Sequence, residues 1–138
     1  MKKLTLVISL FILFACSEDE LKLEVYNPEA FAYQFDTEWE LNASAQVKGF
    51  TQTEEGEEYS TKLSYYVNLV TANGELLEEV DYGMVDKKSK EELLDTQLEI
   101  QISLDSSFVL GEYTLQIFVI DDFSENQDST QVKFSLSE

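Results

Sequence analysis

The chain has 138 residues and carries nine lysines, no arginine and no histidine against 28 acidic residues, which gives a formal net charge of −19. A protein this acidic repels the phosphate backbone of nucleic acid. We therefore predict no nucleic-acid partner. With no histidine to act as a base near neutral pH and no Gly-x-Ser-x-Gly or phosphate-loop motif, we also predict that the protein is not an enzyme.

Residues 1–15 have the pattern of a secretory signal peptide. A positive start, Met1-Lys2-Lys3, is followed by the mostly apolar residues 4–14 and by the small residue Ala15. A helix of eleven residues would be about 17 Å long, whereas the hydrocarbon core of a membrane is about 30 Å thick. The segment is therefore too short for a transmembrane helix.

The end of this signal and the residues after it resemble two motifs of Bacteroidota-type surface lipoproteins. The sequence from Leu13 to Cys16 resembles a lipobox, in which a peptidase cuts before a cysteine that is then acylated; Phe14 is larger than the usual residue there. The next four residues resemble the acidic export signal of the same group: Ser17, Glu18, Asp19 and Glu20.

The two motifs imply a palmitate-type anchor on Cys16 and a lipoprotein of the outer membrane that faces the cell exterior. Two alternatives stay open, namely an ordinary signal peptide with an incidental cysteine and an acidic tether that is merely solvated. Because Cys16 is the only cysteine, the domain has no disulfide.

From residue 21 onward, apolar and polar residues alternate with a period of two, which is typical of antiparallel strands with one buried face. We expect seven or eight short strands, with the clearest at residues 21–26, 31–35, 39–47, 62–70, 75–82, 96–104, 112–120 and 132–136. One segment breaks the alternation. Residues 88–94 contain Ser89 and Glu92 at the spacing of a helix capping box, which predicts a short helical turn.

The segment from Gly111 to Asp122 resembles the sixth strand of bacterial immunoglobulin-like domains, with the pattern Gly-x-Tyr-x-Leu and a terminal aspartate. The resemblance implies an all-β, immunoglobulin-like antiparallel sandwich over residues 21–138. It also implies that Tyr113 forms a hydrogen bond back to the loop before its strand. Trp39 departs from the pattern, because it lies on the second strand and not on the third.

A loop predicted after the sixth strand is rich in carboxylates. Calcium takes six to eight oxygen ligands, so Asp121, Asp122, Glu125 and Asp128 are a candidate Ca²⁺ site that would stabilise the domain. The alternative is that these acids only keep the loop soluble. We expect no other cofactor.

The strand alternation also predicts one apolar outer face. If Leu63 and Val67 point inward, then Tyr66 and Val70 point outward, and the same reasoning places Phe118 and Ile120 outward on the neighbouring strand. Such a patch is typical of an interface. The alternative is that residues 75–80 or Leu93-Leu94 fold over it.

These features lead to two hypotheses for function. The first is an accessory subunit of an outer-membrane protein complex, bound to the membrane by its lipid and to a protein partner by its outer face. The second is a module that binds glycans or other adhesion ligands. Asp128-Ser129-Thr130 also resembles the O-glycosylation motif of the same bacterial group, which makes Ser129 a candidate modification site.

Overall fold

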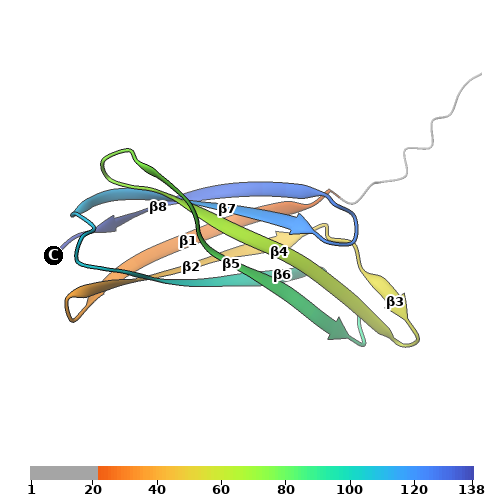
Figure 1. Cartoon of the computed structure of the whole chain (residues 1–138). Coiled ribbons are helices and arrows are strands. Elements are labelled where there is room, and N and C mark those ends of the chain that lie inside the picture. The colour runs from red at the N-terminus through yellow and green to blue at the C-terminus, as the bar shows by residue number, and fades with distance from the viewer. Residues whose placement is uncertain (1–21) are drawn as a thin grey trace, which may run out of the picture.

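The computed structural model describes residues 22–138, which form eight strands in two antiparallel sheets and contain no helix (Figure 1). The strands are β1 (Glu24–Phe35), β2 (Glu38–Lys48), β3 (Thr53–Glu55), β4 (Glu58–Val70), β5 (Leu76–Ser89), β6 (Asp95–Leu104), β7 (Gly111–Asp121) and β8 (Gln127–Leu136). One sheet has the order β1-β2-β6. The other has the order β5-β4-β7-β8, with the short β3 beside the first residues of β4.

The core lies between the two sheets, as in a β-sandwich, and is built from the predicted alternation. On β2, every second residue from Trp39 to Val47 is buried, and the same holds on β6 from Leu98 to Leu104. On β7, every second residue from Tyr113 to Val119 is buried. These predicted inward faces are confirmed. Burial of their apolar side chains is the main force that holds the sheets together.

The two short strands predicted at residues 21–26 and 31–35 are in fact one strand, β1. The pairing of β1 with β2 shifts register between Tyr26 and Glu29, which is a β-bulge. Pro28 has no backbone N–H to give to the ladder, and Asn27 adopts a positive φ of 48°. The bulge therefore lets β1 continue past a residue that would otherwise end it.

The predicted helical turn at residues 88–94 is wrong. Strand β5 continues to Ser89, whose hydroxyl accepts from the backbone N–H of Glu91, two residues on, rather than from the third residue as in a capping box. Further along, the backbone N–H and carbonyl of Leu93 both bond to the side-chain amide of Gln52, at 2.9 and 2.8 Å. A helical nucleus of so few residues is unfavourable, and these bonds satisfy the backbone without it.

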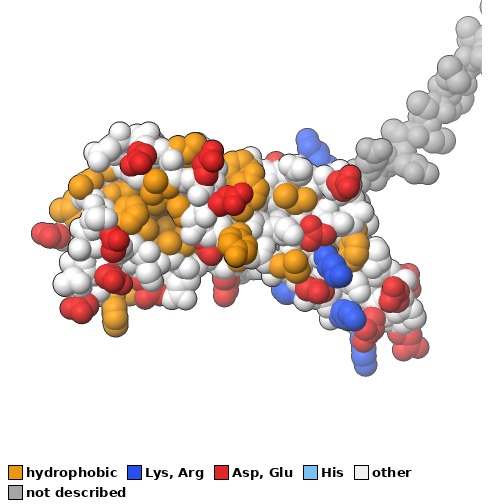
Figure 2. All heavy atoms as spheres, viewed as in Figure 1, with side chains coloured by type: hydrophobic (Ala, Val, Ile, Leu, Met, Phe, Trp, Pro, Cys, Tyr) orange, Lys and Arg blue, Asp and Glu red, His pale blue; other side chains and the backbone are white. Residues whose placement is uncertain are grey.

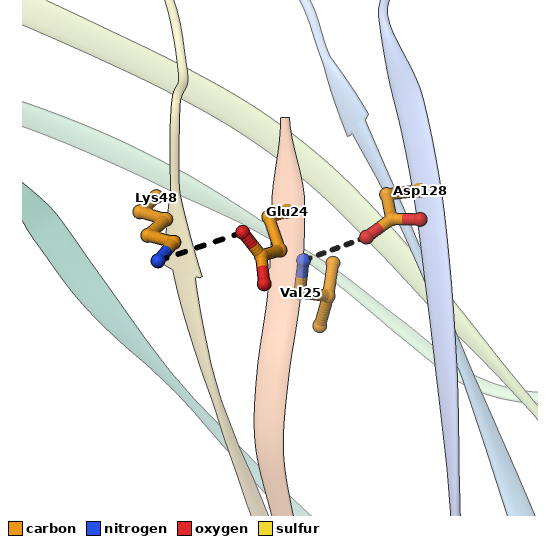
Figure 3. Close-up of polar contacts among 4 residues, drawn as sticks. All are labelled: Glu24, Val25, Lys48 and Asp128. Carbon is orange, nitrogen blue, oxygen red and sulfur yellow. Dashed lines mark hydrogen bonds and ion pairs between the residues drawn. The ribbon is translucent and has the colours of Figure 1, made fainter. Parts of the chain in front are cut away.

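The start of the first strand is tied to both sheets (Figure 3). The backbone N–H of Val25 donates to Asp128 Oδ2 on β8 at 2.8 Å, and Glu24 forms an exposed ion pair of 3.5 Å with Lys48 on β2. Because β1 and β8 start side by side and run the same way, residue 22 and the C-terminus lie at opposite ends of the sandwich (Figure 1).

The buried tyrosine at the start of β7 makes the predicted bond. The Tyr113 hydroxyl donates to the carbonyl of Val109, in the loop between β6 and β7, at 2.6 Å. Its ring stacks on Phe134 of β8 with the ring centres 5.4 Å apart. Burial raises the pKa of Tyr113, so the phenol stays a donor over the whole physiological range. The prediction of this bond is confirmed.

Candidate interaction surface

Two aromatic rings stack at the middle of the outer face of the β5-β4-β7-β8 sheet. Tyr66 on β4 lies directly opposite Phe118 on β7, and their rings are nearly parallel, with the centres 4.7 Å apart and an interplanar angle of 5°. Both side chains are half-buried, since each covers one side of the other and leaves its own outer side open to solvent. The structure thus brings together the two aromatic residues that the sequence placed on this face.

Strand β5 extends the aromatic row. Tyr82 lies opposite Tyr66 on the other side of β4 and is 78% exposed, and Met84, two residues on, is 65% exposed. Figure 2 shows hydrophobic side chains over β5 among acidic ones, with lysines gathered near the end of that strand. Three strands therefore supply one apolar outer surface, which we call the β4–β7 patch: Tyr66, Phe118, Tyr82 and Met84.

A hollow lies beside this patch, and Gly83 of β5 is part of its lining. Gly83 lies opposite Tyr65, and a Cβ on Gly83 would stand only 2.4 Å from the Tyr65 hydroxyl. The tyrosine ring can therefore lie against the bare backbone of β5. The hollow has a volume of about 390 Å³ and is lined by Ser64, Tyr65, Tyr66, Glu79, Tyr82, Gly83 and Met84. Burial raises the pKa of Tyr65, with a smaller contribution from the charge of Asp81.

The other two predicted interface residues flank the patch rather than join it. Ile120 is half-buried and lies opposite Ser64, two residues along β7 from Phe118. Val70 is also half-buried, but it lies four residues from Tyr66, or about 13 Å along the strand.

The alternative that a local segment covers this face is wrong. The residues expected to fold over it belong to β5, which pairs edge to edge with β4 in the same sheet. Leu93 packs against the core, and Leu94 is 84% exposed. Among residues 22–138, nothing lies over the Tyr82 and Met84 side chains, so the patch is open to a partner.

The candidate calcium ligands do not form a metal site in the described residues. Asp121 is fully buried, and its two carboxylate oxygens accept from the backbone N–H groups of Thr51 and Phe123 at 2.6 and 3.0 Å. Its oxygens are thus bound to the protein itself, and they fasten the loop after β7 to the segment between β2 and β3.

The remaining acids of this loop point elsewhere. Asp122 accepts from the Ser64 hydroxyl on β4, and Asp128 accepts from Val25 on β1. Glu125 is exposed. No group of three or more His, Cys, Asp or Glu side chains in the described part of the chain could hold a metal ion. The clustering of the four acids in sequence does not become a cluster in space, because Asp121, Asp122 and Asp128 each accept a different hydrogen bond and Glu125 is exposed.

The other predicted sites are placed as follows. Ser129 is exposed on β8, directly opposite Phe118, so its hydroxyl is accessible and modification there stays a prediction. The predicted lipidation site Cys16, the predicted export signal at residues 17–20 and the predicted signal peptide lie outside the described residues.

Sequence comparison adds no relative. Neither a protein-family model nor a curated protein matches the chain. Within residues 22–138 there is no helix with the length and apolarity needed to cross a membrane.

Sequence reasoning missed the β5 contribution to the patch. In the sequence, Tyr82 and Met84 alternate with Gly83 and Val85. This period of two could have placed Tyr82 and Met84 on the outer face. The alternative of residues 75–80 folding over the patch instead treats this segment as a cover, whereas the outward side chains of β5 form part of the patch.

Proposed function

We propose that this protein is a non-enzymatic lipoprotein of the outer surface, with one immunoglobulin-like domain that serves as an accessory subunit of an outer-membrane protein complex. The domain docks on its partner through the β4–β7 patch, and the lipid on Cys16 holds it at the membrane.

The immunoglobulin-like assignment is supported by the strand order and by one hydrogen bond. The first two strands and β6 form one sheet, while β4, β5, β7 and β8 form the other, so the chain changes sheet after β2, β5 and β6. Immunoglobulin-like sandwiches share this division into two Greek-key sheets. The bond from Tyr113 to Val109 matches the tyrosine corner of that fold, in which the tyrosine at the start of the sixth main strand bonds a few residues upstream.

The short tether keeps the domain near the membrane. Five residues, 16–20, reach at most about 18 Å when fully extended. The described part begins at the end of the sandwich opposite the C-terminus, so one end of the domain stays close to the lipid (Figure 1). A domain held this way is suited to contact a neighbouring membrane protein.

The observation that carries the docking proposal is the exposed aromatic row across three strands. Interfaces are enriched in tyrosine, phenylalanine and methionine, and their energy concentrates in a few such residues. Tyr82 and Met84 are 78% and 65% exposed, on a strand that is paired along most of its length with β4. A protein surface that covers them would remove them from water.

The proposal predicts a partner that depends on the patch. The full chain, solubilised in mild detergent, should co-purify with a membrane protein in a fixed stoichiometric ratio. Replacing Tyr82 and Met84 with serine should reduce that recovery at least about tenfold, because a central aromatic contact is typically worth 2 kcal/mol or more. Both side chains are exposed, so the fold should be unaffected.

The matched control is Leu94→Ser, because Leu94 is equally exposed but lies away from the patch. It should retain the partner in full. Recovery of the Tyr82→Ser/Met84→Ser protein with undiminished partner, or of the unaltered protein with none, would contradict the docking proposal.

A further inference from the structure

The outer face of the second sheet, β1-β2-β6, combines exposed aromatic rings with uncharged hydrogen-bonding groups. Phe31, Tyr33 and Phe35 follow one another on the outward side of β1 and are 62%, 42% and 69% exposed. The rings of Phe31 and Tyr33 stack loosely, with centres 6.5 Å apart. A single exposed ring is ordinary, but a row of three on one edge strand is the kind of surface that marks a binding site.

Amide and hydroxyl side chains lie beside these rings on the two neighbouring strands. The register places Phe31, Asn42 and Gln101 side by side across the sheet, and it does the same for Tyr26, Gln46 and Gln97. Between these two rows lies Ser44. The rows are four residues apart along β2 and β6, or about 13 Å, so the polar strip is extended rather than a single spot.

The surface is hollowed along this strip. Two adjoining hollows of about 620 and 490 Å³ share Glu29, Ser44 and Gln97 in their walls. The bulge at Asn27 and Pro28 forms one wall of the first, and Phe31 forms part of the second.

Several of these polar groups are free to bind a ligand. In the described part of the chain, the side chains of Ser44, Gln46 and Gln97 have no protein hydrogen-bond partner. By contrast, Gln101 donates to Glu40 on β2, which holds its side chain in place. The free amides each offer both donors and an acceptor.

This chemistry points to an uncharged ligand that is rich in hydroxyl groups. Amides and carboxylates can pair with sugar hydroxyls as donors and acceptors, while a flat aromatic ring accommodates the apolar C–H face of a sugar ring. In the three strands, lysine occurs only at position 48, where it is paired with Glu24. Phosphate, sulfate or uronate groups would therefore meet repulsion from the acidic surface.

We propose that the outer face of β1-β2-β6 binds a neutral polysaccharide chain, with Phe31 and Tyr33 stacking on sugar rings and Gln97 bonding their hydroxyls. This site is on the sheet opposite the β4–β7 patch. The polysaccharide proposal can therefore be tested independently of the proposed docking function.

The test is affinity electrophoresis of the full chain, purified in detergent, through native gels that contain a neutral polysaccharide. The probes are amylopectin, galactomannan, mixed-linkage β-glucan and arabinoxylan. At least one should retard the protein. The Phe31→Ala/Tyr33→Ala protein should bind that probe at least about tenfold more weakly, and Gln97→Ala about fivefold more weakly, since each removes a contact without touching the core.

The control variant Tyr82→Ser, on the other sheet, should be retarded as strongly as the unaltered protein. Fluorescence of Trp39, the only tryptophan and a buried one, reports whether each variant is folded. Three results would overturn the proposal: no retardation by any of the four probes, equal retardation of the Phe31→Ala/Tyr33→Ala protein, or retardation that vanishes in about 0.5 M NaCl, which would indicate attraction between charges.

Discussion

Replacing Asp121 with alanine should destabilise the domain by about 3 kcal/mol, a large part of the 5–15 kcal/mol typical of a whole domain. The carboxylate is completely buried and accepts from two backbone N–H groups, at Thr51 and Phe123. Alanine would leave both donors without their protein partner beside a fully buried position. Each unsatisfied buried donor costs about 1–3 kcal/mol.

Urea unfolding followed by Trp39 fluorescence measures this loss. The neighbouring residue supplies the matched control, because Asp122 is exposed and accepts only from the Ser64 hydroxyl. Asp122→Ala should cost less than about 1 kcal/mol. Asp121→Asn should cost less than Asp121→Ala, since its amide oxygen can still accept from one of the two N–H donors while its amide nitrogen faces the other. Equal unfolding midpoints for Asp121→Ala and Asp122→Ala would show that the buried carboxylate does not hold the loop.

Most strands were predictable because a strand with one buried face leaves a period of two in the sequence. The alternation of β6 is complete from Thr96 to Leu104, and each inward residue is buried. The continuity of β1 was not predictable, because Asn27 and Pro28 are typical of a turn and only pairing with β2 carries the strand through them. The helical turn failed for a similar reason, since Gln52, 41 residues away from Leu93, binds its backbone.

The candidate site was predictable only in part. The stack of Tyr66 on Phe118 follows from alternation on two strands that pair in the expected way. The position of β5 depends on sheet order, which alternation does not contain, so the exposure of Tyr82 was missed. The carboxylates after β7 show the opposite error, because closeness in sequence suggested a metal site whereas Asp121 and Asp128 bond to backbone in distant segments.

Replacing Cys16 with serine should abolish acylation altogether. A lipobox needs the cysteine thiol as the acyl acceptor and as the residue before which the signal is cut. Cells fed labelled palmitate should therefore label the unaltered protein and not the variant. The variant should also keep residues 1–15, so its mass should be larger by the mass of these residues. Stable anchoring requires more than one acyl chain, so the loss affects membrane attachment as a whole.

The matched control leaves the cysteine intact and replaces Glu18, Asp19 and Glu20 with alanine. This variant should be labelled like the unaltered protein but become inaccessible to protease added to whole cells, because only the export signal is changed. Palmitate on the Cys16→Ser protein, or an unlabelled parent chain, would contradict the lipoprotein assignment.

The most direct test of the docking account is photo-crosslinking in intact cells, with a benzophenone amino acid in place of Tyr82 in one strain and in place of Ser103 in another. Tyr82 lies in the β4–β7 patch, whereas Ser103 is exposed on the outer face of the opposite sheet. The account predicts one discrete crosslinked membrane protein from position 82 and none from position 103. The same crosslinked band from both positions, or no band from position 82, would contradict it.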